Sequence, residues 1–180
     1  MKYVPTQAGG LRPFVDALPI PSRLGETPMA SIPALPARYF TYGTPKCYTL
    51  REHEAYHRFH RDLPPTLMWT YNGTFPGPII AHRLGTPAAF RRINDLNPSY
   101  RGFGIVETVL HNHGGWQSPE DDGWPMDFIH PGEERMYLIP NQVPDNDRSH
   151  WASTVWYHDH VADHTAGNVY HGLAGMVNQF

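Results

Sequence analysis

Proline and glycine divide this chain into pieces that are too short for long helices. The 180 residues include 19 Pro and 16 Gly, and both residue types destabilise helix interiors. From about Thr44, short apolar or alternating runs are separated by turn residues. The runs are 45–52, 66–72, 78–83, 87–93, 105–113, 134–140, 153–160 and 172–179. This pattern predicts an all-β antiparallel sandwich or barrel, with a short helix expected only within 161–171.

The start of the chain has a different composition. Residues 1–38 are rich in proline and show no apolar period. We interpret 1–44 as an extended arm that wraps a surface or a partner, and 45–180 as one domain. Cys47 is the only cysteine, which excludes an internal disulfide and is compatible with a reducing compartment.

Charge and hydropathy exclude several kinds of partner. The formal net charge is -3 with both signs spread along the chain, so no basic stripe predicts nucleic-acid binding. No apolar run approaches the roughly 20 residues of a membrane span. The N-terminal sequence MKYVPTQAGGLRPF lacks the apolar stretch of a secretory signal. We therefore expect a cytoplasmic chain that binds neither nucleic acid nor a membrane.

Two His-X-His pairs stand out among the 12 histidines. Side chains alternate along a strand, so His111 and His113 project to one side, and His158 and His160 do the same. Two such pairs on neighbouring strands would place four imidazoles around one cavity. Histidine is the commonest metal ligand, so the two pairs together indicate a metal site.

The residues between and after the histidines narrow the choice of site. Asn112 and Asp159 are expected to point away from the cavity. A cupin would need an acidic residue four or five positions after the first pair, but the first one after His113 is Glu120. The strings of a zinc β-lactamase are absent, and the length does not suit the barrel of an amidohydrolase. Imidazole suits copper, zinc, iron and nickel, so the pairs alone leave the metal open.

Ordered motifs carry a resemblance to a known family. They are NGTFPGP at 72–78, HNHG at 111–114, DGWP at 122–125, WYHDH at 156–160 and NVYHGLAG at 168–175. Over about 45–180 the chain resembles the N-terminal cupredoxin domain of three-domain multicopper oxidases, in the branch of bacterial spore-coat laccase, bilirubin oxidase and phenoxazinone synthase. The resemblance implies a cupredoxin-like Greek-key β-sandwich with a Pro-rich N-terminal arm.

The resemblance also implies a reaction and a set of ligands. A type 1 copper takes electrons from a phenolic, aminophenolic or metal substrate, and a trinuclear cluster of type 2 and type 3 coppers reduces dioxygen to water. Carried over by position, His111 would bind the type 2 copper, and His113, His158 and His160 would bind the type 3 pair. Asp122 matches an acidic residue that assists proton delivery near the cluster.

Half of the family's ligand motifs do not occur in this sequence. The His-X-X-His-X-His and His-Cys-His motifs are absent, and Cys47 has no flanking histidine, so we interpret it as a structural thiol. The chain is therefore expected to be a fragment or one subunit of a split enzyme. Further cupredoxin domains, or a second subunit with the His-Cys-His motif, would pack on a large apolar face, in a homo- or hetero-oligomer.

Two other functions remain open from the residues. The chain would be a non-catalytic copper- or zinc-binding module if the four histidines act alone, or a structural cupredoxin domain if its ligands are vestigial. His53, His57 and His60 lie close together in the sequence, and we interpret them as part of a solvated segment rather than as a second metal site. His164 and His171 lie near the second pair in sequence, where either a supporting or a surface role fits.

Overall fold

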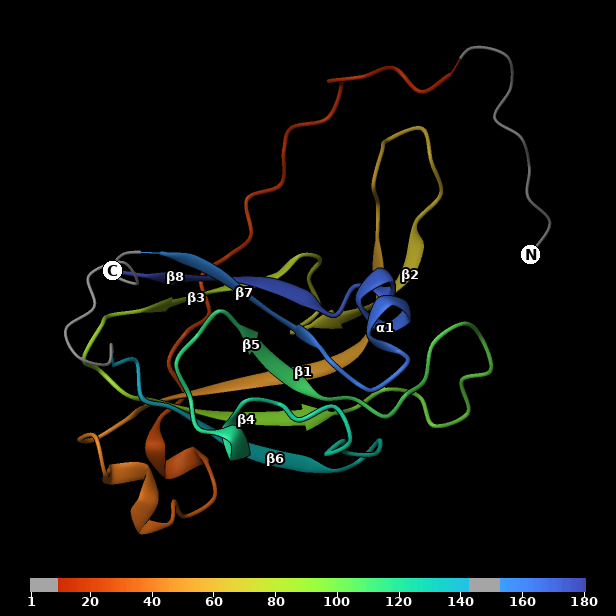
Figure 1. Cartoon of the computed structure of the whole chain (residues 1–180). Coiled ribbons are helices and arrows are strands. Elements are labelled where there is room, and N and C mark those ends of the chain that lie inside the picture. Colours follow the sequence, from red (N-terminus) through yellow and green to blue (C-terminus); the bar gives the residue numbers. More distant parts are fainter. Residues whose placement is uncertain (1–9, 143–152) are drawn as a thin grey trace.

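Two four-stranded β-sheets face each other in a computed structural model that describes residues 10–142 and 153–180 (Figure 1). The first sheet has the order β2 (Thr66–Tyr71), β1 (Lys46–His57), β4 (Ala88–Asn94) and β6 (Glu134–Ile139). The second has the order β3 (Gly77–His82), β8 (Ala174–Gln179), β7 (Thr154–Asp159) and β5 (Leu110–His113). The expected all-β sandwich is therefore confirmed.

The chain crosses repeatedly between the sheets. It changes sheet at every connection from β2 to β7, so each sheet combines segments distant in sequence. β1 pairs in parallel with β4, and β3 with β8, while the other neighbours are antiparallel. A single α-helix is described, α1 (Thr165–His171), within the segment expected to be helical. Short 3-10 turns lie at Met29–Ser31, Ala37–Phe40 and Pro119–Asp121.

The strand expected over 105–113 is shorter than predicted. Only Leu110–His113 is a strand, because Ile105 and Val109 bond to side chains and Thr108 forms only an isolated bridge with Ile129. Asn168 accepts from the amide of Ile105 at 3.1 Å, and the carboxylate of Asp159 accepts from the amide of Val109 at 2.7 Å. An amide bonded to a side chain is not available to a neighbouring strand, so the ladder begins at Leu110.

A buried ion pair lies within the core between the sheets. Arg92 and Glu52 are fully buried, with Nε and Oε1 2.8 Å apart. Thr108 donates to Glu52 at 2.6 Å, and Arg92 donates to the hydroxyl of Tyr137 at 3.0 Å. The charges are therefore paired and hydrogen-bonded, and removing one partner would leave the other uncompensated, at a cost of about 3–5 kcal/mol.

Part of the Pro-rich arm packs on both sheets. The amide of Leu24 donates to Ile79 at the edge of the second sheet, and the amide of Thr27 donates to Cys47 in the first. A second apolar cluster then forms on the first sheet, from Ile32, Tyr39, Cys47, Ala89 and Leu138. Cys47 is buried, and burial raises the pKa of its thiol, as suits a structural cysteine. No helix among the described residues is long and apolar enough to cross a bilayer.

The buried His82 makes the fold sensitive to acid. Burial lowers the pKa of His82 from 6.5 to about 4, while its ring meets Tyr48 and Phe90 edge-on. The unfolded chain therefore binds a proton at a higher pH than the folded chain does. The contribution of His82 to stability is intact above pH 6.5 and falls by about 3 kcal/mol as the pH drops to 4.

We predict that His82→Phe reduces this loss of stability while keeping the aromatic contacts. Urea unfolding at pH 7 and at pH 4.5 measures the difference in the free energy of unfolding between the two pH values. His130→Phe, at an exposed histidine, is the control and should retain the wild-type difference. An unchanged pH dependence in the His82→Phe variant would contradict the assignment.

Candidate metal centre

The two histidine pairs meet because their strands are antiparallel neighbours. β5 and β7 pair with His111 opposite His158 and with His113 opposite Trp156. The ring centroid of His111 lies 5.4 Å from that of His158 and 4.8 Å from that of His160. The ring of His113 lies 5.5 Å from that of His158. All four predicted ligand residues therefore form one cluster along the β5–β7 strand pair.

Three of the four histidines come closest to a shared ion position. Ligand atoms of His111, His113 and His158 all lie within 4.8 Å of one another. Across residues 10–142 and 153–180, no other group of three or more histidine, cysteine, aspartate or glutamate side chains meets this criterion. His160 stands beside the trio, next to His111. The donor set consists of imidazoles, which suit copper and zinc among other ions.

Backbone carbonyls orient two of the rings. The Nδ1 of His111 lies 2.5 Å from the carbonyl oxygen of Asp122, and the Nδ1 of His158 lies 2.6 Å from that of Asp159. A carbonyl oxygen only accepts, so each Nδ1 carries the proton and donates it. The Nε2 of each ring keeps its lone pair for a metal. This is the arrangement in which a protein acceptor sets the tautomer of a ligand histidine.

A hydroxyl orients the third ring in the same way. The Nδ1 of His160 lies 3.1 Å from the Oγ1 of Thr165, whose own hydroxyl donates to the carbonyl of Val161 at 3.0 Å. Because that proton is already committed, Thr165 accepts from His160 and again leaves Nε2 free. Thr165 was missed by sequence reasoning, since nothing local marks a threonine at the start of a helix as a partner of a ligand.

His113 differs from the other three histidines. It offers Nδ1 to the cluster, 3.2 Å from the Nε2 of His158. Its side chain is exposed, and its ring stacks on Trp156, which also stacks on His158 at 4.0 Å. The cluster is thus buried on the side of His158 and open to solvent on the side of His113.

Burial keeps the inner imidazoles neutral. It lowers the pKa of His158 to about 4, against the opposing effect of the hydrogen bond to Asp159, and the neighbouring imidazoles lower it further. Burial and the nearby His111 also lower the pKa of His160. Because a metal binds the deprotonated imidazole, these two rings would lose little free energy to protons at neutral pH. The donor set therefore fits copper.

Asp122 lies at the rim of the cluster. Its Oδ1 is 3.3 Å from the Nδ1 of His111, and its side chain is 49% exposed. Gln117 donates to the same carboxylate at 2.5 Å and to the carbonyl of Asn112 at 3.0 Å. Gln117 thus joins Asp122 to the first histidine pair. Sequence reasoning missed this glutamine, because only the folded loop brings it to both partners.

The N-terminal arm anchors the loop that carries Asp122. The neighbouring Asp121 is buried and accepts from Arg38 at 2.6 Å and from the amide of Leu138 at 2.9 Å. A charge-assisted pair with a buried carboxylate is stronger than an exposed one. Arg38, 83 positions away in sequence, therefore helps to hold the loop that supports His111.

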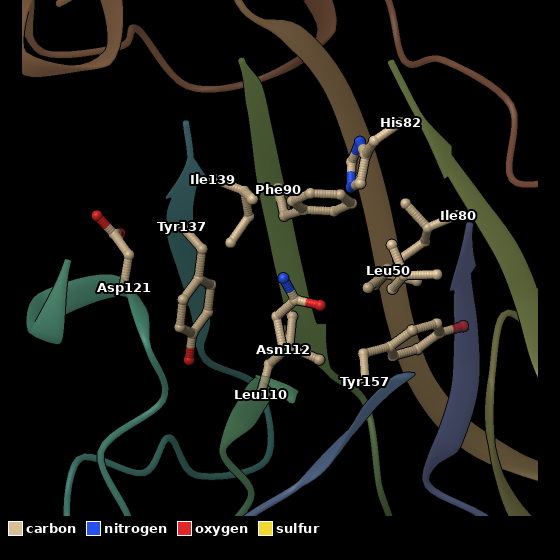
Figure 2. Close-up of a pocket in the computed structure, with 11 residues that line it drawn as sticks. Leu50, Ile80, His82, Phe90, Leu110, Asn112, Asp121, Tyr137, Ile139 and Tyr157 are labelled. Carbon is tan, nitrogen blue, oxygen red and sulfur yellow. The ribbon is translucent and has the colours of Figure 1, made fainter. Parts of the chain in front are cut away.

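The middle residues of the pairs point into the fold, as strand alternation predicts. Asn112 is buried among core side chains that line a cavity of about 20 Å³, enough for about one water molecule (Figure 2). Its Oδ1 has no hydrogen-bond partner among the described residues. Asp159 is fully buried, and burial raises the pKa of its carboxyl to about 7.

The other histidines that the structure describes lie outside the cluster. His57 packs against phenylalanine rings, and the Nε2 of His60 is 2.9 Å from the carbonyl of Arg12. His171 stacks on Trp69 at a centroid distance of 4.4 Å. Among the described residues these side chains contribute no second group of metal ligands.

Comparisons with known proteins agree with this geometry. A family profile described as multicopper oxidase matches residues 55–178. A laccase of Bacillus subtilis (strain 168) is 35% identical over 188 residues, covering 92% of this chain and 33% of the laccase. A bilirubin oxidase of Albifimbria verrucaria is 32% identical, covering 67% of this chain and 18% of that enzyme.

Solved structures give the same result. A Campylobacter jejuni protein titled as a multicopper oxidase, a metallo-oxidase, matches with a TM-score of 0.68 and 26% identity, over 100% of this chain and 33% of that one. A laccase from Pediococcus acidilactici Pa5930 matches with a TM-score of 0.69 and 25% identity, over 95% and 30%. These matches confirm the cupredoxin-like sandwich. The chain spans about a third of the length of the first curated relatives it matches.

The close approach of Gly123 to β5 gives a test of the loop's role. A Cβ at Gly123, where φ is +78°, would lie 2.1 Å from the carbonyl oxygen of Leu110 and 2.9 Å from the Cα of His111. We predict that Gly123→Ala pushes the Asp122 loop off the strand, weakens copper binding and destabilises the fold by roughly 2–4 kcal/mol through clash and strain.

Gly132→Ala is the matched control for this substitution. Gly132 has a similar φ of +90°, but a Cβ there would meet nothing within 4 Å. Gly132→Ala should destabilise the fold only by the strain of an alanine in left-handed backbone, about 1–2 kcal/mol, and should leave copper binding unchanged. Thermal unfolding and copper titration measure both effects. Equal behaviour of the two variants would contradict the proposed support of His111 by the loop.

Proposed function

This chain belongs to the multicopper oxidase family, and on that premise we propose that it supplies half of the histidines of a trinuclear copper cluster in a laccase-like oxidase. The observation that carries the proposal is the register of β5 against β7, which gathers four imidazoles along this strand pair. When bound there, copper would supply the one-electron steps by which dioxygen is reduced to water while a phenolic, aminophenolic or metal substrate is oxidised.

Each histidine has a proposed place. His111 is assigned to the type 2 copper, and His113, His158 and His160 to the type 3 pair. Three of these rings offer Nε2, because their Nδ1 protons are held by Asp122, Asp159 and Thr165. The rings are thus oriented by the protein alone, which lowers the entropy lost when a metal binds.

Further cupredoxin domains are proposed to complete the enzyme. The exposure of His113 supports an additional part on that side. Trp124 and Met126, each 65% exposed, lie just after Asp122 and Gly123 in the chain. The amide of Ala162 donates to the carbonyl of Pro125 at 3.1 Å and holds this segment beside the second histidine pair. Exposed aromatic and methionine side chains are enriched where proteins pack together.

Asp122 is proposed to deliver protons to the cluster. Reduction of dioxygen consumes protons, and a carboxylate that reaches both solvent and the site can hold and release them. Asp122 meets both conditions, since it is 49% exposed and its Oδ1 lies 3.3 Å from the ring of His111. The amide of Gln117 holds the carboxylate in that position.

Replacing His111 and His113 by Ala tests the ligand assignment. In the assembled oxidase we expect the variant to retain much less copper, measured by mass spectrometry of the metal, and to lose oxygen uptake. His130→Ala with His164→Ala, at two exposed histidines outside the cluster, is the control and should keep both properties. Unchanged copper content in the His111/His113 variant would reject the assignment.

Copper content and oxygen uptake, measured with this chain alone and with its partner part, also separate the alternative functions. A copper- or zinc-binding module would retain metal on this chain alone, since three ligand atoms within 4.8 Å suffice for one ion, and would show no oxygen uptake with any partner. A domain with vestigial ligands would retain no metal. Oxygen uptake that requires both this chain and a part carrying the His-Cys-His motif supports the proposed oxidase.

Asp122→Asn tests the proposed delivery of protons. The asparagine keeps an oxygen that accepts from Gln117 but loses the carboxylate that carries protons. We expect copper content to stay unchanged and oxygen uptake to fall by about 100-fold. Asp95→Asn, at a carboxylate paired with Arg51 outside the cluster, is the control. Wild-type oxygen uptake by the Asp122→Asn variant would exclude the proton-delivery role.

A further inference from the structure

A carboxylate lies buried between two of the proposed ligands. Asp159 separates His158 from His160 and is fully buried. Placing a carboxylate in the core is costly unless hydrogen bonds compensate it. Among the described residues, its hydrogen bonds come from two main-chain amides, that of Val109 at 2.7 Å to Oδ1 and that of Val161 at 3.3 Å to Oδ2.

These two amides belong to the backbone that carries both histidine pairs. Val109 lies two residues before His111, and Val161 follows His160 directly. A single side chain therefore binds the main chain before the first pair and after the second, at one end of the β5–β7 ladder. The amide of His160 also donates to the carbonyl of Val109 at 3.2 Å, so Val109 is bonded through both of its backbone groups.

The position of this contact matters because the sheet ends there. The ladder between β5 and β7 stops at the pair Leu110 and Asp159, so His160 lies beyond the last regular strand pairing. His111 and His158, by contrast, are held opposite each other within the ladder. The backbone of His160 is held by its own hydrogen bond to Val109, and the carboxylate of Asp159 adds contacts to the amides of Val109 and Val161 beside it.

We propose that Asp159 is a positioning residue, whose carboxylate joins the ends of β5 and β7 and so sets the place of His160 relative to His111. This inference rests on the proposed function, in which these histidines hold copper. The contact accounts for the 4.8 Å between the two rings without any contact between Asp159 and the metal.

The chemistry of the two amides requires a carboxylate. An aspartate offers an acceptor oxygen to each amide, whereas an asparagine offers one oxygen and turns an NH₂ donor toward the other amide. Val109 and Val161 are buried, so water would not replace a lost acceptor without a rearrangement of the backbone. The middle residue of the other pair does not act in this way, since Asn112 bonds to Gln117 instead.

Graded substitution in the assembled oxidase tests the inference. Asp159→Asn should keep the shorter contact to Val109 and lose that to Val161, whereas Asp159→Ala loses both. We expect copper affinity to fall by about 10-fold for the asparagine variant and by about 100-fold for the alanine variant. The electron paramagnetic resonance spectrum of the bound copper should change in the asparagine variant. If only the negative charge of Asp159 mattered, the asparagine and alanine variants would lose the same copper affinity.

Two controls separate positioning from stability and from the proposed function. Val177→Ala, in the core on β8, is expected to lower the melting temperature. The strand partners of Val177 are Ile80 and Val155, so the variant should keep wild-type copper affinity and spectrum. Equal loss in that variant, equal loss in the two Asp159 variants, or wild-type copper binding by both of them would overturn the inference. If the His111/His113 alanine variant also keeps its copper, the proposed function itself fails; if that variant loses copper, only the role of Asp159 is rejected.

Discussion

The antiparallel pairing of β5 with β7 is the constraint on which the site depends. Its register sets His111 opposite His158, and because side chains alternate along each strand, both pairs emerge on the same side of the sheet. A slip of one residue would turn the histidines of one strand into the core and bring Asn112 or Asp159 to the outside. The buried carboxylate of Asp159 opposes such a slip, since its contact with the amide of Val109, just before β5, depends on the observed register.

Support for the cluster comes from several parts of the fold. A carbonyl in the 114–123 loop orients His111, the start of α1 orients His160, and the ion pair between Arg38 and the buried Asp121 ties the loop to the N-terminal arm. Burial keeps His158 neutral at physiological pH, so that ring is ready to bind a metal. The exposed His113 and the apolar residues beside the loop give the histidine cluster an open side, in a chain that spans about a third of the length of the first curated relatives it matches.

Much of the architecture could be predicted from sequence. Alternating runs and frequent turn residues predicted most of the strands, and strand alternation predicted the directions of the His-X-His side chains. The strand predicted over 105–113 was wrong for 105–109, because Asn168 and Asp159 take backbone hydrogen bonds that a local pattern assigns to a neighbouring strand. The division into an arm at 1–44 and a domain at 45–180 stays a prediction, although residues of the arm pack on both sheets.

The sequence by itself determined that the chain is all-β and that its motifs resemble those of one oxidase family. It also determined that four of its histidines form two His-X-His pairs, with the side chains of each pair on one side of a strand. These are properties of residue type and spacing, which act over a few positions. Only the tertiary structure decided that the two pairs meet, that Gln117 and Thr165 hold Asp122 and His160, and that Asp159 joins the two strand ends. Val109 and Asp159 are 50 residues apart in the chain, and a contact of that kind depends on which strands become neighbours when the core packs.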